Sequence, residues 1–273
     1  LIRSLSMFGV LFVLAACGGG GGTAAPAAPP SNLDTSFGNG GKVVTEFTGL
    51  RSEVHAVAIQ PSDGKIVVAG YAGSTTDIDF ALARYNTNGT LDTSFNSRFT
   101  CSFDLPDCGT LATDFGTGTD VQDATVVVQA DGKILVGGAV AGNRIALERY
   151  NANGTLDTDF GPANTGRITK TVSGLWGLTN IVLQADGKIV AAGTVSSSTN
   201  YEDFFVARFT ADGEPDVSFG SGGTGMVQTD FLNDEDFAYA LAIQPLDGKI
   251  VAAGSAFNNG NGAFHFAVAR YLP

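Results

Sequence analysis

The sequence predicts an all-β fold built from four tandem copies of one unit, each with about four antiparallel strands. Three observations lead to this prediction. Three short phrases recur in the same order four times, and Asp-Gly and Asn-Gly dipeptides separate short apolar runs. The chain of 273 residues is also rich in glycine, with 37, and poor in charge, at 15%. Helical bundles and coiled coils need many more charged residues and tolerate glycine poorly, so both are excluded.

The repeated phrases define the boundaries of the four units. In unit 1 they read LDTSFG, AIQPSDGKIVVAG and DFALARY, at residues 33–38, 58–70 and 79–85. The aspartate of the first phrase recurs in steps of 58, 65 and 59 residues, at Asp34, Asp92, Asp157 and Asp216. The units are therefore residues 33–90, 91–155, 156–214 and 215–273.

Each unit contains four stretches with the composition of β-strands. In unit 1 they are KVVTEF, VHAVAIQ, KIVVAG and FALARY, which are rich in β-branched and aromatic residues. Asp63-Gly64 lies between the second and third stretches and is a strong hairpin signal, and Asn88-Gly89 marks the turn into unit 2. Four short antiparallel strands repeated about every 60 residues are typical of propeller blades. The sequence therefore predicts a β-propeller-like fold, whose ring is closed either by one chain or by two.

The three phrases resemble the delta-60 repeat, a tandem repeat of bacterial secreted and surface proteins that is regarded as a β-propeller of unknown function. The resemblance covers residues 33–271. Unit 2 departs most from the pattern, with an insertion at 96–118 and with Arg144-Ile145 in place of Asp-Phe. The resemblance implies the fold, and it brings no catalytic residue and no cofactor to this chain.

The N-terminal residues predict export and lipid attachment. Residues 1–16 contain Arg3 followed by an apolar run that is too short to span a bilayer, as in a secretory signal peptide. Leu14-Ala15-Ala16-Cys17 resembles the lipobox of bacterial lipoproteins, which implies a lipid on Cys17. Residues 17–32 are then a lipidated tether rich in Gly, Pro and Ala. Gly18 rather than an acidic residue follows Cys17. We therefore expect the protein to be anchored in the cell envelope, at the outer membrane, on its periplasmic or surface face.

Arginines and aspartates recur together in the units and predict structural ion pairs. Each unit carries one arginine near the end of its fourth strand and one aspartate in the LDTSF phrase, seven or eight residues apart across a turn. The residues concerned are Arg84 and Asp92, Arg149 and Asp157, Arg208 and Asp216, and also Asp34 and Arg270. We expect these pairs to stabilise the fold. The alternative is a ring of arginines that binds an anion.

The turns between units partly match a calcium-binding loop. Asn86-x-Asn88-Gly89-x-x-Asp92 and its counterparts place oxygen-bearing residues around a glycine, as calcium loops do. The first ligand position is however occupied by an arginine, Arg84 in unit 1. We therefore interpret the segments as Asx-type turns and predict no metal site.

Cys101 and Cys108 lie in the insertion of unit 2. In an exported protein two cysteines this close in sequence predict a disulfide bond that closes the loop.

Function is expected where the copies differ, and Trp176 is the candidate binding residue because it is the only tryptophan. A net charge of −12 argues against a nucleic-acid partner. No catalytic motif recurs, so we expect no enzyme but a binding or interaction scaffold for an unidentified protein or carbohydrate. The alternatives are a structural subunit of an envelope assembly complex and a carbohydrate-active or lactone hydrolase.

Overall fold

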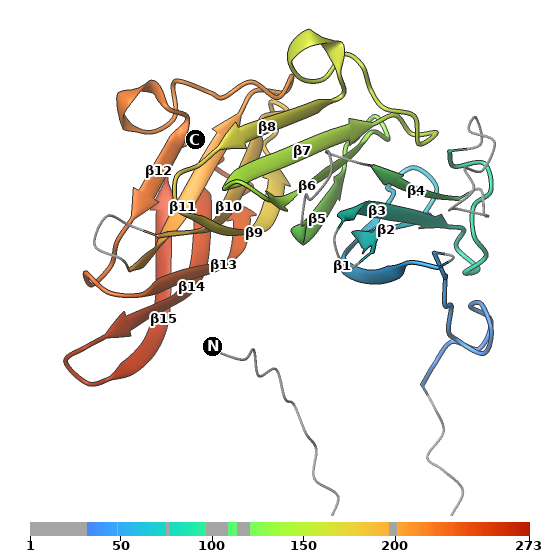
Figure 1. The fold of residues 1–273 in the computed structure, drawn as a ribbon, viewed down its shortest axis with the longest axis horizontal. Coiled ribbons are helices and arrows are strands. Elements are labelled where there is room, and N and C mark those ends of the chain that lie inside the picture. Colours follow the sequence, from blue (N-terminus) through green and yellow to red (C-terminus); the bar gives the residue numbers. More distant parts are fainter. Residues whose placement is uncertain (1–31, 48, 75–76, 97–108, 114–120, 197–200) are drawn as a thin grey trace, which may run out of the picture. The chain divides into compact units, whose positions relative to one another are not determined.

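A computed structural model describes residues 32–47, 49–74, 77–96, 109–113, 121–196 and 201–273. Asp34–Pro273 forms one compact unit, which is the part of the chain considered below. Its described residues are arranged in antiparallel sheets with short turns between the strands, and two short 3-10 turns are the helical segments (Figure 1). The predicted all-β fold is therefore confirmed.

The strands form four sheets in the described residues, each in simple sequence order. The first sheet contains β1 (Arg51–Ile59), β2 (Ile66–Gly73), β3 (Ile78–Tyr85) and β4 (Thr110–Thr113). The second contains β5 (Gln122–Val128), β6 (Ile134–Val140), β7 (Arg144–Tyr150) and β8 (Arg167–Thr171). The third contains β9 (Leu175–Leu183), β10 (Ile189–Ser196), β11 (Glu202–Phe209) and β12 (Met226–Thr229). The fourth has three strands, β13 (Asp236–Ile243), β14 (Ile250–Asn258) and β15 (Ala263–Tyr271).

The outermost strand of each four-stranded sheet comes from the following sequence unit. β4, β8 and β12 follow the LDTSF phrase of the next copy and pair back onto β3, β7 and β11. The corresponding stretch of unit 1, KVVTEF at 42–47, was predicted as a strand, and this prediction is wrong for the structure. No copy precedes it in the folded unit Asp34–Pro273, so it has no strand to pair with.

The glycine that ends the KIVVAG-type phrase in units 1, 3 and 4 is needed for close strand packing. Gly193 in β10 lies against β9, where a β-carbon would come within 2.0 Å of the carbonyl oxygen of Gly177. Gly70 and Gly254 occupy the same position in the first and fourth sheets, with the same close approach. A larger residue would force the first two strands of the sheet apart.

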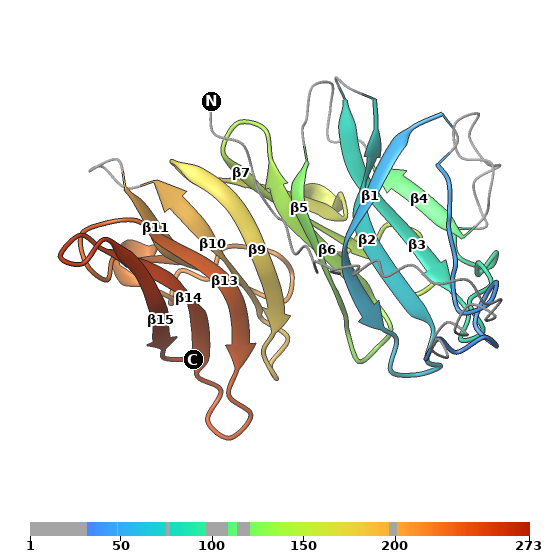
Figure 2. The ribbon, with the colours of Figure 1, turned by 90° about the horizontal axis from the view of Figure 1, so that it is seen from below.

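The core lies between consecutive sheets rather than inside any one of them. Buried residues of β2 and β3 cluster with those of β6, those of the second sheet with the third, and those of the third with the fourth. The first strands of the sheets also meet, since β5 contacts both β1 and β9, and β9 contacts β13 (Figure 2). Each sheet is therefore stabilised mainly by its neighbours.

Three of the predicted arginine–aspartate pairs are present and buried. Arg149 Nε lies 2.6 Å from Asp157 Oδ2, and the corresponding distances are 2.7 Å for Arg84 and Asp92 and 2.8 Å for Arg208 and Asp216. Each guanidinium also stacks 4.6 Å above the phenylalanine ring of the same LDTSF phrase, which is Phe160 beside Arg149. The pair thus fixes the linking phrase to the strand that precedes it.

The Arg149 side chain also joins two units. Its Nη1 donates to the carbonyl oxygen of Ala211 at 2.7 Å, in the turn after β11 of the next unit. Burial alone would raise the pKa of Asp157, but hydrogen bonds from Lys133 and Arg149 outweigh burial and lower that pKa below its ordinary value. The carboxylate therefore remains charged at neutral pH and keeps both cations in place.

We expect Asp157→Ala to lower the free energy of unfolding by about 3 kcal/mol at neutral pH, because it leaves Arg149 buried without its anion. The control is Asp159→Ala, an exposed aspartate of the same phrase, which should change stability by less than about 0.5 kcal/mol. Urea denaturation followed by circular dichroism measures both. Equal stability of the two variants would mean that the pair does not stabilise the fold.

Candidate functional site

The outward face of the fourth sheet is the main feature that distinguishes it from the other three. Phe266 and Val268 of β15 are 102% and 61% exposed. The residues at the same positions of the other three copies are 0% exposed, namely Phe80 and Leu82, Ile145 and Leu147, and Phe204 and Val206. Those residues lie in the clusters shared with the next sheet, whereas in the described structure no sheet follows the fourth.

The polar residues at this end also lack the partners that their counterparts have. Arg270 is exposed, and the one hydrogen bond found for it among the described residues joins it to Gln244 Oε1 at 3.5 Å. Asp34, at the other end of the folded unit, is exposed too and accepts hydrogen bonds from the backbone and hydroxyl of Ser36. The predicted pairing therefore extends to three arginines, while Arg270 and Asp34 each lie at an open end.

The first sheet has an exposed apolar face on its other side, where the later sheets are covered by the sheet that precedes them. Val57 of β1 is 63% exposed, whereas Val126, Ile181 and Leu241 at the same position are buried against the preceding sheet. Ile59, two residues further along β1, is exposed as well. The face of the first sheet that a preceding sheet would cover is thus apolar and open.

Residues 33–46 are here called the linking segment of unit 1. On one side this segment makes the same contacts as the corresponding segments of later copies. Gly38 N donates to the carbonyl oxygen of Asn88 at 2.8 Å, as Gly161 N does to Asp212 in the third copy. The Thr45 hydroxyl lies 2.6 Å from that of Tyr85, as Thr229 lies 2.8 Å from Tyr271. In later copies the other edge of this segment pairs with the previous sheet. In unit 1 no described strand pairs with that edge, and Val44 is exposed.

Trp176, the candidate binding residue, is 60% exposed at the start of β9. Its ring meets Phe237 edge-on, with centroids 6.5 Å apart, and Phe237 in turn contacts Tyr239 and Phe264. Tyr239 and Phe264 are exposed, and Phe264 lies on the same strand as Phe266. Trp176 therefore lies at the border of the aromatic surface that the open fourth sheet presents.

The remaining sequence predictions concern the turns between units, the three cysteines and the insertion of unit 2. Asn88 Oδ1 accepts hydrogen bonds from the backbone and hydroxyl of Thr90, and Asn153 Oδ1 accepts them from Thr155, so these two turns between units are Asx turns. Cys17, Cys101 and Cys108 lie outside the described residues. The outer strand β4 falls within the insertion predicted at 96–118.

The structure also brings together three carboxylates that were not predicted as a site. Asp203, Asp230 and Asp236 come from separate elements and offer oxygen atoms within 4.8 Å of one another. The sequence carries a signal for them, because Thr229-Asp230-Phe231 and Asp236 repeat the spacing of Thr113-Asp114-Phe115 and Asp120. Asp114 and Asp120 lie outside the described residues.

A comparison with family models matches four segments to "Domain of unknown function (DUF5122) beta-propeller", at residues 62–95, 129–160, 184–219 and 246–273. The chain is a β-propeller repeat protein. Each matched segment of this β-propeller protein begins at or just before the Asp-Gly hairpin of one copy, in agreement with the four sheets. No curated protein sequence matches the chain.

Two of the solved structures that match the chain are distant likenesses. A hypothetical protein from Leishmania major is 14% identical with a TM-score of 0.41, and the alignment covers 81% of this chain and 66% of that one. MPT-4, a mannose phosphorylase from Leishmania mexicana, is 8% identical with a TM-score of 0.38, covering 83% and 64%. This chain thus spans slightly less than two thirds of their length. Among the described residues, none forms a helix with the length and hydrophobicity to cross a bilayer.

Proposed function

We propose that this β-propeller protein is a lipid-anchored scaffold of the cell envelope, which works by assembly rather than catalysis. Its fourth sheet takes the missing outer strand from a second copy of the chain. The observation that carries the proposal is the exposure of Phe266 and Val268, at positions that the other three copies bury completely.

The register of the proposed contact follows from the three outer strands in the structure. Leu82 pairs with Leu111 and Val206 with Val227, which places Val43 of the second copy opposite Val268. By the same register Ala267 faces Val44, as Ala81 faces Ala112. The Thr45 position then lies beside Phe266, where Thr229 lies beside Phe204. The linking segment of unit 1 thus supplies the strand that the fourth sheet lacks.

The polar groups fit the same arrangement. Asp92 N donates to the carbonyl oxygen of Arg84 while the two side chains pair, and the two later copies repeat this pattern. At the proposed contact the corresponding residues are Asp34 of one copy and Arg270 of the other, which are both exposed in the single chain. The exposed Val57 and Ile59 of the first sheet would then cover the aromatic face of the fourth. Burial of each large apolar side chain stabilises such a contact by roughly 1.5–3 kcal/mol.

A second copy suits this contact better than the chain's own first sheet does. The first and fourth sheets lie at opposite ends of the row of sheets in both views (Figures 1 and 2). A contact between two different surfaces generates a ring when the rotation closes. Two copies of four sheets give a ring within the size range of known propellers, which is roughly four to eight blades. We therefore propose a closed head-to-tail dimer.

We expect the full chain to be a dimer in solution and Phe266→Asp to make it monomeric, because a charge cannot be buried between the sheets. Sedimentation velocity measures both masses. Leu246→Asp is the matched control, since Leu246 is 99% exposed on a hairpin turn whose counterparts are exposed in every copy, and it should leave the dimer intact. A monomeric wild-type chain, or a dimeric Phe266→Asp variant, would overturn the proposal.

Cross-linking tests the register and the identity of the partner. When chains carrying Val44→Cys are mixed with chains carrying Ala267→Cys, we expect a disulfide-linked dimer, because residues opposite each other in antiparallel strands have β-carbons about 5 Å apart. Each single variant oxidised alone controls for the native cysteines. A double variant that forms the bond within one chain would show that the chain closes its own ring, which contradicts a dimer.

We expect wild-type protein produced in a bacterium to sediment with the outer membrane, and Cys17→Ala to be released from it, because the lipid on Cys17 is the proposed anchor. Cys101→Ala is the control and should stay with the membrane. Immunoblotting of fractionated cells measures the distribution. The anchor is wrong if Cys17→Ala remains in the membrane fraction, and the dimer proposal does not depend on that result.

A further inference from the structure

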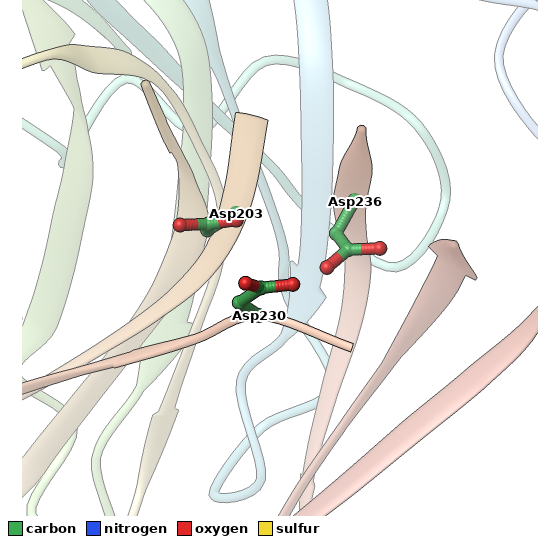
Figure 3. Close-up of side chains that lie close together, drawn as sticks. All are labelled: Asp203, Asp230 and Asp236. Carbon is green, nitrogen blue, oxygen red and sulfur yellow. The ribbon is translucent and has the colours of Figure 1, made fainter. Parts of the chain in front are cut away.

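Three aspartates meet where the third sheet joins the fourth. Asp203 lies at the start of β11, Asp230 directly follows β12, and Asp236 is the first residue of β13. Each offers an oxygen atom within 4.8 Å of the others, and their carboxylates gather around a common space (Figure 3). Two of the three, Asp203 and Asp236, are buried, while Asp230 is exposed and leaves the group open to solvent.

Asp236 has an oxygen atom that the protein does not satisfy. The residue is 0% exposed, and its Oδ2 accepts a hydrogen bond from Phe231 N at 2.7 Å. Its Oδ1 is buried and has no hydrogen-bond donor in the part of the chain that the structure describes. A buried carboxylate oxygen without a donor or a cation costs considerable free energy, so such atoms are rare in folded proteins.

The charges around Asp236 are all of one sign. Among the described residues, Asp203, Asp230 and Asp236 form no ion pair with a lysine, arginine or histidine. Asp234 is buried in the same loop, and no described residue donates a hydrogen bond to its Oδ2. Burial raises the pKa of Asp236 to about 6, against the hydrogen bond from Phe231 and together with the charges of Asp230 and Asp203. At neutral pH the group therefore needs a positive charge that the described side chains do not supply.

We propose that Asp203, Asp230 and Asp236 bind one divalent cation, Ca²⁺, between the third and fourth sheets. Calcium takes oxygen ligands at about 2.3–2.6 Å, so two ligands of one ion lie at most about 5 Å apart, and the three carboxylates meet that limit. The donors are all hard oxygen atoms, and neither histidine nor cysteine is among them, which disfavours zinc. Exposed Asp230 leaves room for water as a further ligand.

The loop between β12 and β13 is built to hold this arrangement. The Phe231 ring packs edge-on against Phe204 of β11, with centroids 4.9 Å apart, and this fixes the N–H that binds Asp236. Asp230 Oδ1 accepts from Asn233 N at 2.6 Å, so the loop folds back on itself. A cation bound here would fasten the loop and join β11 of the third sheet to β13 of the fourth.

The test is calcium binding by the full chain. After treatment with EGTA, isothermal titration with CaCl₂ should give at least one site per chain. The midpoint of thermal unfolding should rise by roughly 5–10 °C at a concentration about 100 times the Kd. Asp236→Asn should bind more than about tenfold more weakly, since calcium affinity follows the number of charged ligands. Asp131→Asn is the control, because it removes the same charge from an exposed turn and should bind as the wild type does.

The stability of Asp236→Asn without calcium is a second readout. It shows whether the variant is folded, and it does not depend on calcium binding. In EGTA at pH 7.5, Asp236→Asn should be more stable than the wild type, because the variant removes one of three carboxylates that lie close together without a cation. Absence of calcium binding, unchanged binding by Asp236→Asn, or an equal effect of Mg²⁺ would overturn the proposal.

Discussion

The apolar side chains of the third strand in each sheet are covered by the sheet that follows, and most of this structure depends on that contact. Phe80 and Leu82 are buried in a cluster with residues of β5 and β6 of the second sheet. A single blade of this kind has two apolar faces and no core of its own. Each sheet thus needs a neighbouring sheet on both faces to bury its apolar side chains. The first and fourth sheets each lack one of these neighbours in the described structure.

The linking segment of each unit comprises its LDTSF phrase and the residues up to the end of the outer strand. These segments connect the sheets and fix their order. The linking segments of units 2, 3 and 4 pair as outer strands with the sheet of the preceding unit. Those of units 2 and 3 also contact the turn at the end of their own unit. The Arg149–Asp157 pair secures both connections at once, since Arg149 also reaches Ala211 of the next unit. Long polar side chains at identical positions therefore stabilise the joints, which explains why they recur in successive units.

Much of this could be predicted from the sequence because the signals are local and repeated. Asp63-Gly64 forms its hairpin and Arg84 meets Asp92 within a few residues of chain, so spacing was sufficient. The strand prediction at 42–47 failed because strand formation there depends on a partner sheet that no local pattern reveals. The exposure of Phe266 could not be predicted either, because the sequence around it matches the sequence around Phe204, which is buried by a following sheet.

The three aspartates and the proposed contact between copies occupy corresponding places in the repeat, yet their chemistry differs. Phe204 pairs with Thr229, which sets Asp203 beside Asp230 and creates a concentration of negative charge. In the proposed dimer Phe266 takes the place of Phe204 and Thr45 that of Thr229, so His265 would lie beside Glu46. A histidine next to a carboxylate can be neutral or paired without a metal. Calcium would therefore strengthen the joint between the third and fourth sheets, while the joint between copies would form without it.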